Sequence, residues 1–199
     1  MELVGPTLSL RPLRREDVPD LFVLGADPEV TRWFSWGPYR SLDEPRRYVE
    51  DQLGRRARGE QLDLLMVHHE DGPVGVTGLS ELSLRDRRAI VGTWFGRRWW
   101  GTGLNLEAKA LVAHLAFAGC GLERLGAYAD VRHERSQRAL EKVGFRREGV
   151  LRGFHRHGEV QKDVALFALL RDDWPASPLT AIPVELRGEV PPAFAVPAP

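Results

Sequence analysis

The sequence of 199 residues is poor in lysine, asparagine and cysteine. Of its 28 basic residues only Lys109, Lys142 and Lys162 are lysines, and Asn105 is its one asparagine. Asparagine and cysteine are chemically labile, so their scarcity fits adaptation to heat, although codon bias in a GC-rich genome explains the arginine excess equally well. The single cysteine, Cys120, excludes a disulfide within the chain and a cysteine-based zinc site.

Net charge is also absent, because 28 acidic residues balance the 28 basic ones. Nucleic-acid binders usually carry an excess of basic charge, so we expect no nucleic-acid partner. The sequence also lacks a secretory signal and the run of ~18 apolar residues that a membrane helix needs. We therefore expect a soluble, cytoplasmic protein without a membrane partner.

Apolar residues make up 43% of the chain, which is enough for a buried core. At about 100–200 residues per domain, this length predicts one domain, here residues 1–174. Residues 175–199 hold seven of the 14 prolines and therefore should form neither a helix nor an inner strand. We expect this C-terminal tail to be extended, or docked on the domain or on the partner subunit of a homodimer.

Strand and helix patterns alternate along residues 1–174. Short apolar or alternating runs predict strands at 7–11, 62–69, 74–84, 89–95, 125–131, 145–151 and 164–169. Helical spacing predicts helices at 17–25, 41–58, 104–119 and 134–143. Because strands come first in succession and later alternate with helices, we expect an α/β fold with a mixed, mostly antiparallel sheet flanked by helices.

The most informative segment, residues 95–108, leaves a predicted strand through a glycine-bearing turn and enters a predicted helix. Such a turn directs backbone N–H groups and the positive end of a helix dipole at one point. Gly101 and Gly103 let the backbone approach an anion, and Arg97 and Arg98 can meet phosphate oxygens. A purely structural turn is the alternative. The segment contains neither G-x-x-x-x-G-K-[ST] nor G-x-G-x-x-G, which excludes two other phosphate-binding loops.

Several segments resemble the GCN5-related N-acetyltransferase (GNAT) family. Arg98-x-x-Gly101-x-Gly103 matches its Q/R-x-x-G-x-G/A signature, and residues 130–149 look like its N-x-x-S-x-x-x-x-E-K-x-G-F-x-x-E-G segment. Residues 10–13 and 167–174 resemble the branch that contains the ribosomal-protein N-terminal acetyltransferases. The resemblance covers residues 7–174 and implies the GNAT-like acyl-CoA N-acyltransferase fold.

The resemblance implies that an acetyl group moves from acetyl-CoA directly to a primary amine, without a metal. We expect a protein N-terminal α-amine as acceptor; the alternative is a small-molecule amine such as a polyamine, an amino acid or an aminoglycoside. A non-catalytic acyl-CoA-binding regulatory module is a further alternative. The resemblance places acetyl-CoA at Trp94, Phe95, Gly96, Arg98, Trp99, Trp100, Gly101, Thr102, Gly103, Leu104, Asn105, Arg132 and Ser136.

The resemblance also implies three catalytic candidates. Many members carry a tyrosine that protonates the CoA thiol where this chain has Leu140, so we expect Ser136 to be the proton donor unless it only caps its helix. His133 replaces a family asparagine and either binds the pantetheine, acts as a base or is an exposed loop histidine. Glu81 is the nearest candidate base, because residues 89–94 hold no carboxylate. Alternatively, the amine arrives partly neutral and needs no base.

Two further groups of side chains are expected around the ligands. The aromatic residues at 33–39 correspond to the region that lines the acceptor site in the family, with core packing as the equal alternative. Five arginines are expected to gather around one pyrophosphate: Arg97, Arg98, Arg132, Arg135 and Arg138.

Overall fold

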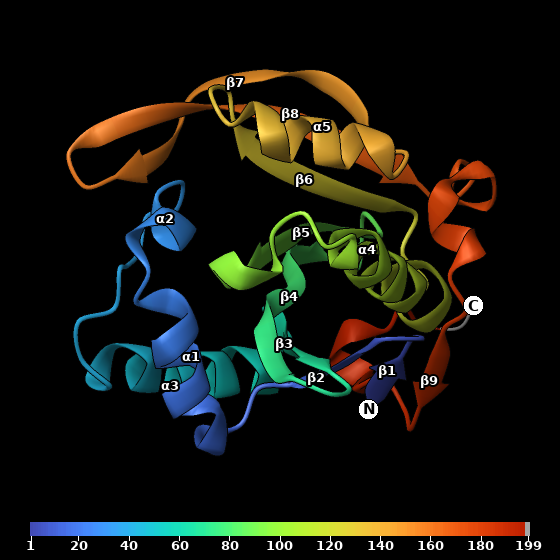
Figure 1. Cartoon of the computed structure of the whole chain (residues 1–199). Coiled ribbons are helices and arrows are strands. Elements are labelled where there is room, and N and C mark those ends of the chain that lie inside the picture. Colours follow the sequence, from blue (N-terminus) through green and yellow to red (C-terminus); the bar gives the residue numbers. More distant parts are fainter. Residues whose placement is uncertain (198–199) are drawn as a thin grey trace.

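The computed structural model describes residues 1–197 and arranges them as one twisted sheet with helices on both faces (Figure 1). The spatial order of the strands is β7-β8-β6-β5-β4-β3-β2-β1-β9. The strands are β1 (Glu2–Val4), β2 (Leu8–Pro12), β3 (Leu62–His68), β4 (Gly72–Ser83), β5 (Arg88–Phe95), β6 (Arg124–Asp130), β7 (Arg146–His157), β8 (Val160–Leu170) and β9 (Glu185–Arg187).

The α-helices are α1 (Val18–Gly25), α2 (Pro28–Thr31), α3 (Asp43–Ala57), α4 (Leu104–His114) and α5 (Glu134–Lys142). Single turns of 3-10 helix lie at Arg15–Asp17, Arg97–Trp99, Trp174–Ala176, Pro178–Ala181 and Pro192–Phe194. Among residues 1–197, β5 and β6 form the one parallel pair of neighbouring strands. The sequence-based prediction of a mixed, mostly antiparallel sheet flanked by helices is confirmed.

Three predicted elements differ clearly in extent from the observed ones. Strands β7 and β8 extend into a long hairpin, and residues 152–154 and 159–161 of this extension are exposed, so no buried apolar pattern marks them. The helix predicted at 104–119 is α-helical only as far as His114 and continues as a π-helical turn, Leu115–Gly119. Apolar spacing does not reveal this change of hydrogen-bond pattern.

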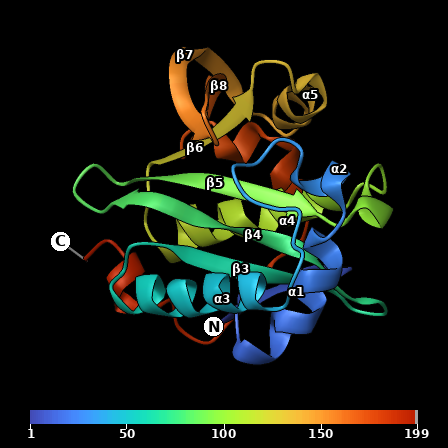
Figure 2. The same ribbon diagram turned by 90° about the vertical axis from the view of Figure 1, so that its left-hand side faces the viewer.

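The helices bury two different faces of the sheet. Helices α1 and α3 cover one face of β3 and β4, and α4 lies on the other (Figure 2). Side chains alternate along β3 accordingly: Leu64 and Met66 belong to the larger core under α4, whereas Leu65 belongs to the smaller core under α1 and α3. The sheet is therefore buried on both sides in its centre.

Strands β5 and β6 separate soon after they begin. Their parallel pairing consists of Arg88 with Arg124, Ala89 with Leu125 and Ile90 with Gly126. Beyond these pairs, β5 stays paired with β4 as far as Phe95, and β6 stays paired with β8 as far as Asp130. The second half of each strand therefore leaves one row of backbone groups facing the other strand without a ladder.

Residues 175–197 pack on the domain. Strand β9 pairs antiparallel with β1, and Phe194 and Leu179 are fully or almost fully buried in the larger core. Pro178 and Pro192 open one-turn 3-10 helices, which the sequence-based expectation of no helix had missed. A proline at the first helical position forfeits no hydrogen bond, because the N–H there has no partner within the helix.

Replacing Phe194 with alanine should destabilise the protein by about 3–5 kcal/mol, because its side chain is 0% exposed and its loss leaves a cavity. Denaturant unfolding of the wild type and the variant measures this difference. Phe154→Ala is the matched control, since Phe154 is 44% exposed and its loss should change stability by less than about 1 kcal/mol. Equal effects of the two substitutions would contradict the structural role of the tail.

Candidate active site

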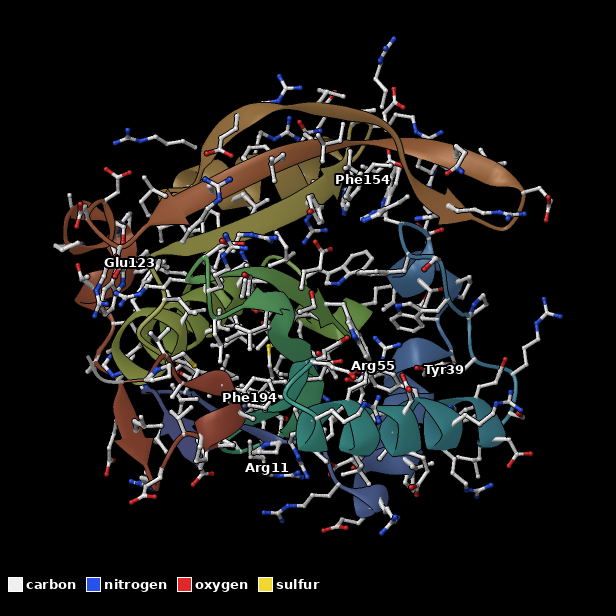
Figure 3. The ribbon with its side chains drawn as sticks, turned by 180° about the vertical axis from the view of Figure 1, so that it is seen from behind. Arg11, Tyr39, Arg55, Glu123, Phe154 and Phe194 are labelled. Carbon is white, nitrogen blue, oxygen red and sulfur yellow. The ribbon has the colours of Figure 1, made fainter. Side chains whose placement is uncertain are left out.

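A cavity of about 780 Å³ lies between α3, the segment 34–39 and strands β3–β5. Figure 3 shows Tyr39 and Arg55 on the α3 side of the molecule. Gly78 and Gly92 pair across β4 and β5 and leave this patch of the sheet without side chains. Aromatic and charged side chains line the cavity: Phe34, Trp36, Tyr39, Glu44, Arg47, Tyr48, Asp51, Arg55, Asp63 and Trp94. We name it the acceptor cavity.

A carboxylate, Asp63, is held against the wall of the acceptor cavity by neutral donors. The Tyr48 hydroxyl donates to Asp63 Oδ2 at 2.6 Å, and Gln61 Nε2 donates to both carboxylate oxygens at 3.0 Å. Burial raises the pKa of Asp63 above its ordinary value, and burial together with Asp63 raises the pKa of Tyr48 well above its own. Within residues 1–197 no ion pair balances Asp63, so a cation in this cavity would be stabilised.

A second cavity, of about 190 Å³, occupies the space where β5 and β6 separate. It is closed on its other sides by α4 and α5, and its lining includes Trp33, Phe34, Gly92, Thr93, Asn105, Lys109, Tyr128, Asp130, His133, Ser136, Leu140 and His155. Phe34, Gly92 and Thr93 line both cavities. The two cavities are therefore adjacent at the middle of β5. We name the second one the strand slot.

The backbone of β5 offers hydrogen-bond donors to the strand slot. Gly96 N–H donates to Val74 O of β4 at 2.9 Å, so this N–H group is unavailable to acetyl-CoA, although the resemblance places the ligand at Gly96. Successive strand residues point their backbone N–H groups to opposite sides. The N–H group of Trp94, two residues before Gly96, therefore also points toward β4. Phe95, and Thr93 before it, direct their N–H groups toward β6. Of Trp94, Phe95 and Gly96, at which the resemblance places acetyl-CoA, only Phe95 directs its N–H group into the strand slot.

The glycine-bearing loop opens α4 in a conformation that needs glycine. Gly101 and Gly103 have φ values of 80° and 90°, in the left-handed region, and Gly103 caps the helix. A Cβ atom at either position would meet no heavy atom within 4 Å. The loop therefore encloses open space next to the first N–H groups of α4, which have no partner within the helix.

Most arginines near the loop are already paired. Arg98 forms an ion pair with Asp71 at 2.6 Å and lies over the Trp99 ring, and Arg132 pairs with Asp130 at 3.0 Å. Arg97 and Arg138 also contact carboxylates. Arg135 instead lies over the Trp100 ring, 5.0 Å from its centre, with no carboxylate partner within residues 1–197. Of the five arginines, Arg135 is therefore the one that can bind an anion without breaking an ion pair.

The structure places two of the three catalytic candidates in the strand slot. Ser136 and His133 both line it. His133 is not an exposed loop histidine: its ring stacks on Trp33 at 4.7 Å, and burial, followed by the charge of Arg135, lowers its pKa below the ordinary 6.5. The ring is therefore neutral at neutral pH.

The third candidate, Glu81, lies outside both cavities. It is exposed in an irregular stretch of β4, has a φ of 49° and accepts a hydrogen bond from the Tyr128 hydroxyl at 3.2 Å. The irregularity that turns its side chain toward Tyr128 cannot be read from strand periodicity. The structure therefore does not bring the expected base to the acceptor.

Lys109 is a site residue that sequence reasoning missed. Its side chain is 5% exposed, lines the strand slot and donates to Thr93 Oγ1, which lies 2.7 Å from Thr77 Oγ1. Burial lowers its pKa from 10.5 to about 7, and no carboxylate opposes this effect. The sequence did offer one signal for this site residue, a lysine within a predicted apolar helix, because charged residues are rarely buried without a partner.

The expectation that the reaction needs no metal stays a prediction. Within residues 1–197, no group of three or more His, Cys, Asp or Glu side chains is placed to hold a metal ion. In the same part of the chain, no helix has the length and apolar character to cross a membrane.

The strand slot and the glycine-bearing loop before α4 contain positions at which the resemblance to an acyl-CoA-dependent acyltransferase family places acetyl-CoA, among them Asn105, Ser136 and Gly103. The family model described as "Acetyltransferase (GNAT) domain" matches residues 7–146, and the chain belongs to the GNAT family. It is an acetyl-CoA-dependent N-acetyltransferase. The alternative of a non-catalytic binding module is therefore set aside.

Named relatives cover most of the chain. The uncharacterized N-acetyltransferase p20 of Bacillus licheniformis is 26% identical over 169 residues, which are 84% of this chain and 94% of the relative. The spermidine N(1)-acetyltransferase of Escherichia coli (strain K12) is 27% identical over 149 residues, 73% of this chain and 76% of the relative. Among solved structures, RimL, the ribosomal L7/L12 α-N-protein acetyltransferase with coenzyme A, has a TM-score of 0.74 at 23% identity, covering 84% of this chain and 96% of that one.

The variant Lys109→Met should be more thermostable than the wild type at about pH 6, and this advantage should shrink toward about pH 10. Between the folded pKa of about 7 and the unfolded value of 10.5, the unfolded chain binds the extra proton, so the stability of the wild type rises with pH. Methionine has no charge to bury and lacks this dependence.

Thermal denaturation at the two pH values measures the difference, with Lys142→Met as the matched control because Lys142 is exposed on α5. The control should shift the melting temperature equally at both. An advantage of Lys109→Met that does not change with pH would show that Lys109 keeps its ordinary pKa.

Proposed function

We propose that the protein transfers the acetyl group of acetyl-CoA to a primary amine held in the acceptor cavity. The observation that carries this proposal is that the two cavities are adjacent at Gly92 and Thr93, which line both. An amine in the acceptor cavity and a thioester in the strand slot would share this point. Such proximity removes much of the entropic barrier of a two-substrate reaction.

The strand slot and the glycine-bearing loop fit acetyl-CoA. The open space at Gly101 and Gly103 suits a pyrophosphate, with the N–H groups of Leu104 and Asn105 and the side chain of Arg135 as partners. The pantetheine arm would lie in the slot, beside β5. The N–H group of Phe95 would donate to the thioester oxygen, where negative charge develops as the amine attacks.

The acceptor cavity favours a cationic acceptor over a neutral one. Its lining holds three carboxylates, Glu44, Asp51 and Asp63, against two arginines, Arg47 and Arg55, of which Asp51 engages Arg55 at 2.8 Å. The rings of Trp36 and Trp94, whose centres are 5.2 Å apart, form an aromatic wall beside these charges. A polyamine fits this wall: one amine is acetylated while another stays charged near Asp63.

A protein N-terminal α-amine is the second candidate acceptor. The opening and closing segments of the sequence favoured it, and RimL, which carries ribosomal L7/L12 in its name, shares the fold. A volume of about 780 Å³ admits the first residues of a peptide. The charge near Asp63 then favours a peptide whose second or third residue is basic.

The variant Gly103→Asp should weaken binding of acetyl-CoA at least about tenfold, because the added carboxylate occupies the space at the helix start and repels phosphate. Isothermal calorimetry measures the affinity. Gly158→Asp is the matched control: its φ of 59° is also left-handed and its Cβ also meets open space, so the backbone strain is similar. Equal affinities for the two variants would place the pyrophosphate elsewhere.

The variant Asp63→Asn should raise KM for a polyamine about tenfold or more and leave kcat and the affinity for acetyl-CoA nearly unchanged, because it removes charge without removing volume. Thiol release with spermidine, a neutral monoamine and N-terminal peptides measures this. The monoamine is the control, since it lacks the second charge. A wild type that acetylates only peptides would overturn the polyamine assignment, and one that accepts no amine would overturn the proposed function.

A further inference from the structure

Lys109 is the one lysine buried in the strand slot, and the proposed function leaves it without a task. We infer that Lys109 is the acid that protonates the sulfur of CoA as it leaves. The inference rests on the proposed function, because it assumes that the thioester lies in the slot. It replaces the earlier expectation that Ser136 alone supplies this proton.

The surroundings of Lys109 leave it free to act on a ligand. It lies on α4 against β5, and within residues 1–197 its side chain makes one hydrogen bond, to Thr93 Oγ1. That hydroxyl also contacts Thr77 Oγ1 and donates to Gly92 O at 2.8 Å, so its place is fixed. An ammonium group has three N–H donors, so two remain for a group in the slot.

The slot contains no better acid. Leu140, at the position where many family members carry the donor tyrosine, cannot donate a proton, and it lines the same slot as Lys109. The hydroxyl of Ser136 is a far weaker acid than an ammonium group. An alkyl thiol has a pKa of about 8.5, so an ammonium group with a pKa of about 7 can protonate its thiolate.

The other titratable groups around Lys109 are held by other residues or are poor proton donors at neutral pH. From β6, Asp130 is held by Arg132, and burial raises the pKa of Tyr128 to about 12. From α5, His133 is neutral, and His155 of β7 forms the far wall against Tyr128. On α4 itself, Glu107 accepts from the backbone N–H groups of Thr7 and Leu8 on the β2 side.

The proton transfer balances within one turnover. The neutral acceptor nitrogen bonds to the acetyl carbon, and the carbon–sulfur bond breaks with its electron pair moving to sulfur. The Lys109 ammonium gives a proton to this sulfur and becomes a neutral amine. The acceptor nitrogen releases one proton to water, and Lys109 takes one from water before the next cycle.

The test measures the thiol of bound CoA by the ultraviolet absorbance of its thiolate during a pH titration, in the wild type and in Lys109→Met. In the wild type, the thiol and the Lys109 ammonium should titrate as a coupled pair, so that part of the thiolate appears near pH 7, below the pKa of free CoA, and the rest at higher pH. In Lys109→Met the bound thiol should titrate as a single group, without the part near pH 7. Lys142→Met, which changes an exposed lysine of α5, should behave like the wild type.

The rate gives the second readout. Loss of an acid should lower kcat about 10²-fold or more, with affinity for CoA within a few-fold of the wild type, and should remove the fall of kcat above about pH 7. Lys109→Arg keeps a charge but cannot release a proton, so it should not restore kcat. A bound thiol that titrates alike in the wild type and in Lys109→Met overturns the inference, whereas a wild type that fails to bind CoA overturns the proposed function instead.

Discussion

The site depends on one constraint, the short pairing of β5 with β6. Three residue pairs join the strands, and beyond Ile90 and Gly126 each strand remains fixed by its outer neighbour. Continued pairing would fill the strand slot with backbone and would consume the N–H group of Phe95. Because β4 and β8 hold the separated halves rigidly, the slot exists before any ligand binds. Such preorganisation lowers the free energy needed to assemble the site.

The two cavities have the same electrostatic feature. Each buries one ionisable group whose partners in the protein are neutral: Asp63 with Tyr48 and Gln61, and Lys109 with Thr93. Burial shifts both groups toward their neutral forms. In a folded protein such groups destabilise the native state, so their retention is expected where a ligand or a reaction uses them. Asp63 and Lys109 lie on opposite sides of the sheet, so they do not form an ion pair with each other.

The sequence predicted the parts of this structure that local chemistry determines. The conformations of Gly101 and Gly103 follow from a turn between a strand and a helix, and the mixed sheet follows from the order of the elements. It could not predict contacts between distant segments, such as the ion pair of Arg98 with Asp71. Glu81 was misplaced for the same reason, because an irregular strand end turned it away. Lys109 was overlooked because a helical pattern of apolar residues conceals which position faces the slot.

Gly78 and Gly92 leave the floor of the acceptor cavity bare, but the two glycines are not equivalent. A methyl group at Gly78 would collide with Asp63 Oδ1 at 2.5 Å, whereas one at Gly92 would meet no atom within 4 Å. Position 92 can therefore hold a larger side chain without a clash with the surrounding fold. Under the proposed function, each carbon added there would shorten the acceptor that reaches the thioester, so a single position in the middle of β5 would set the acceptor length.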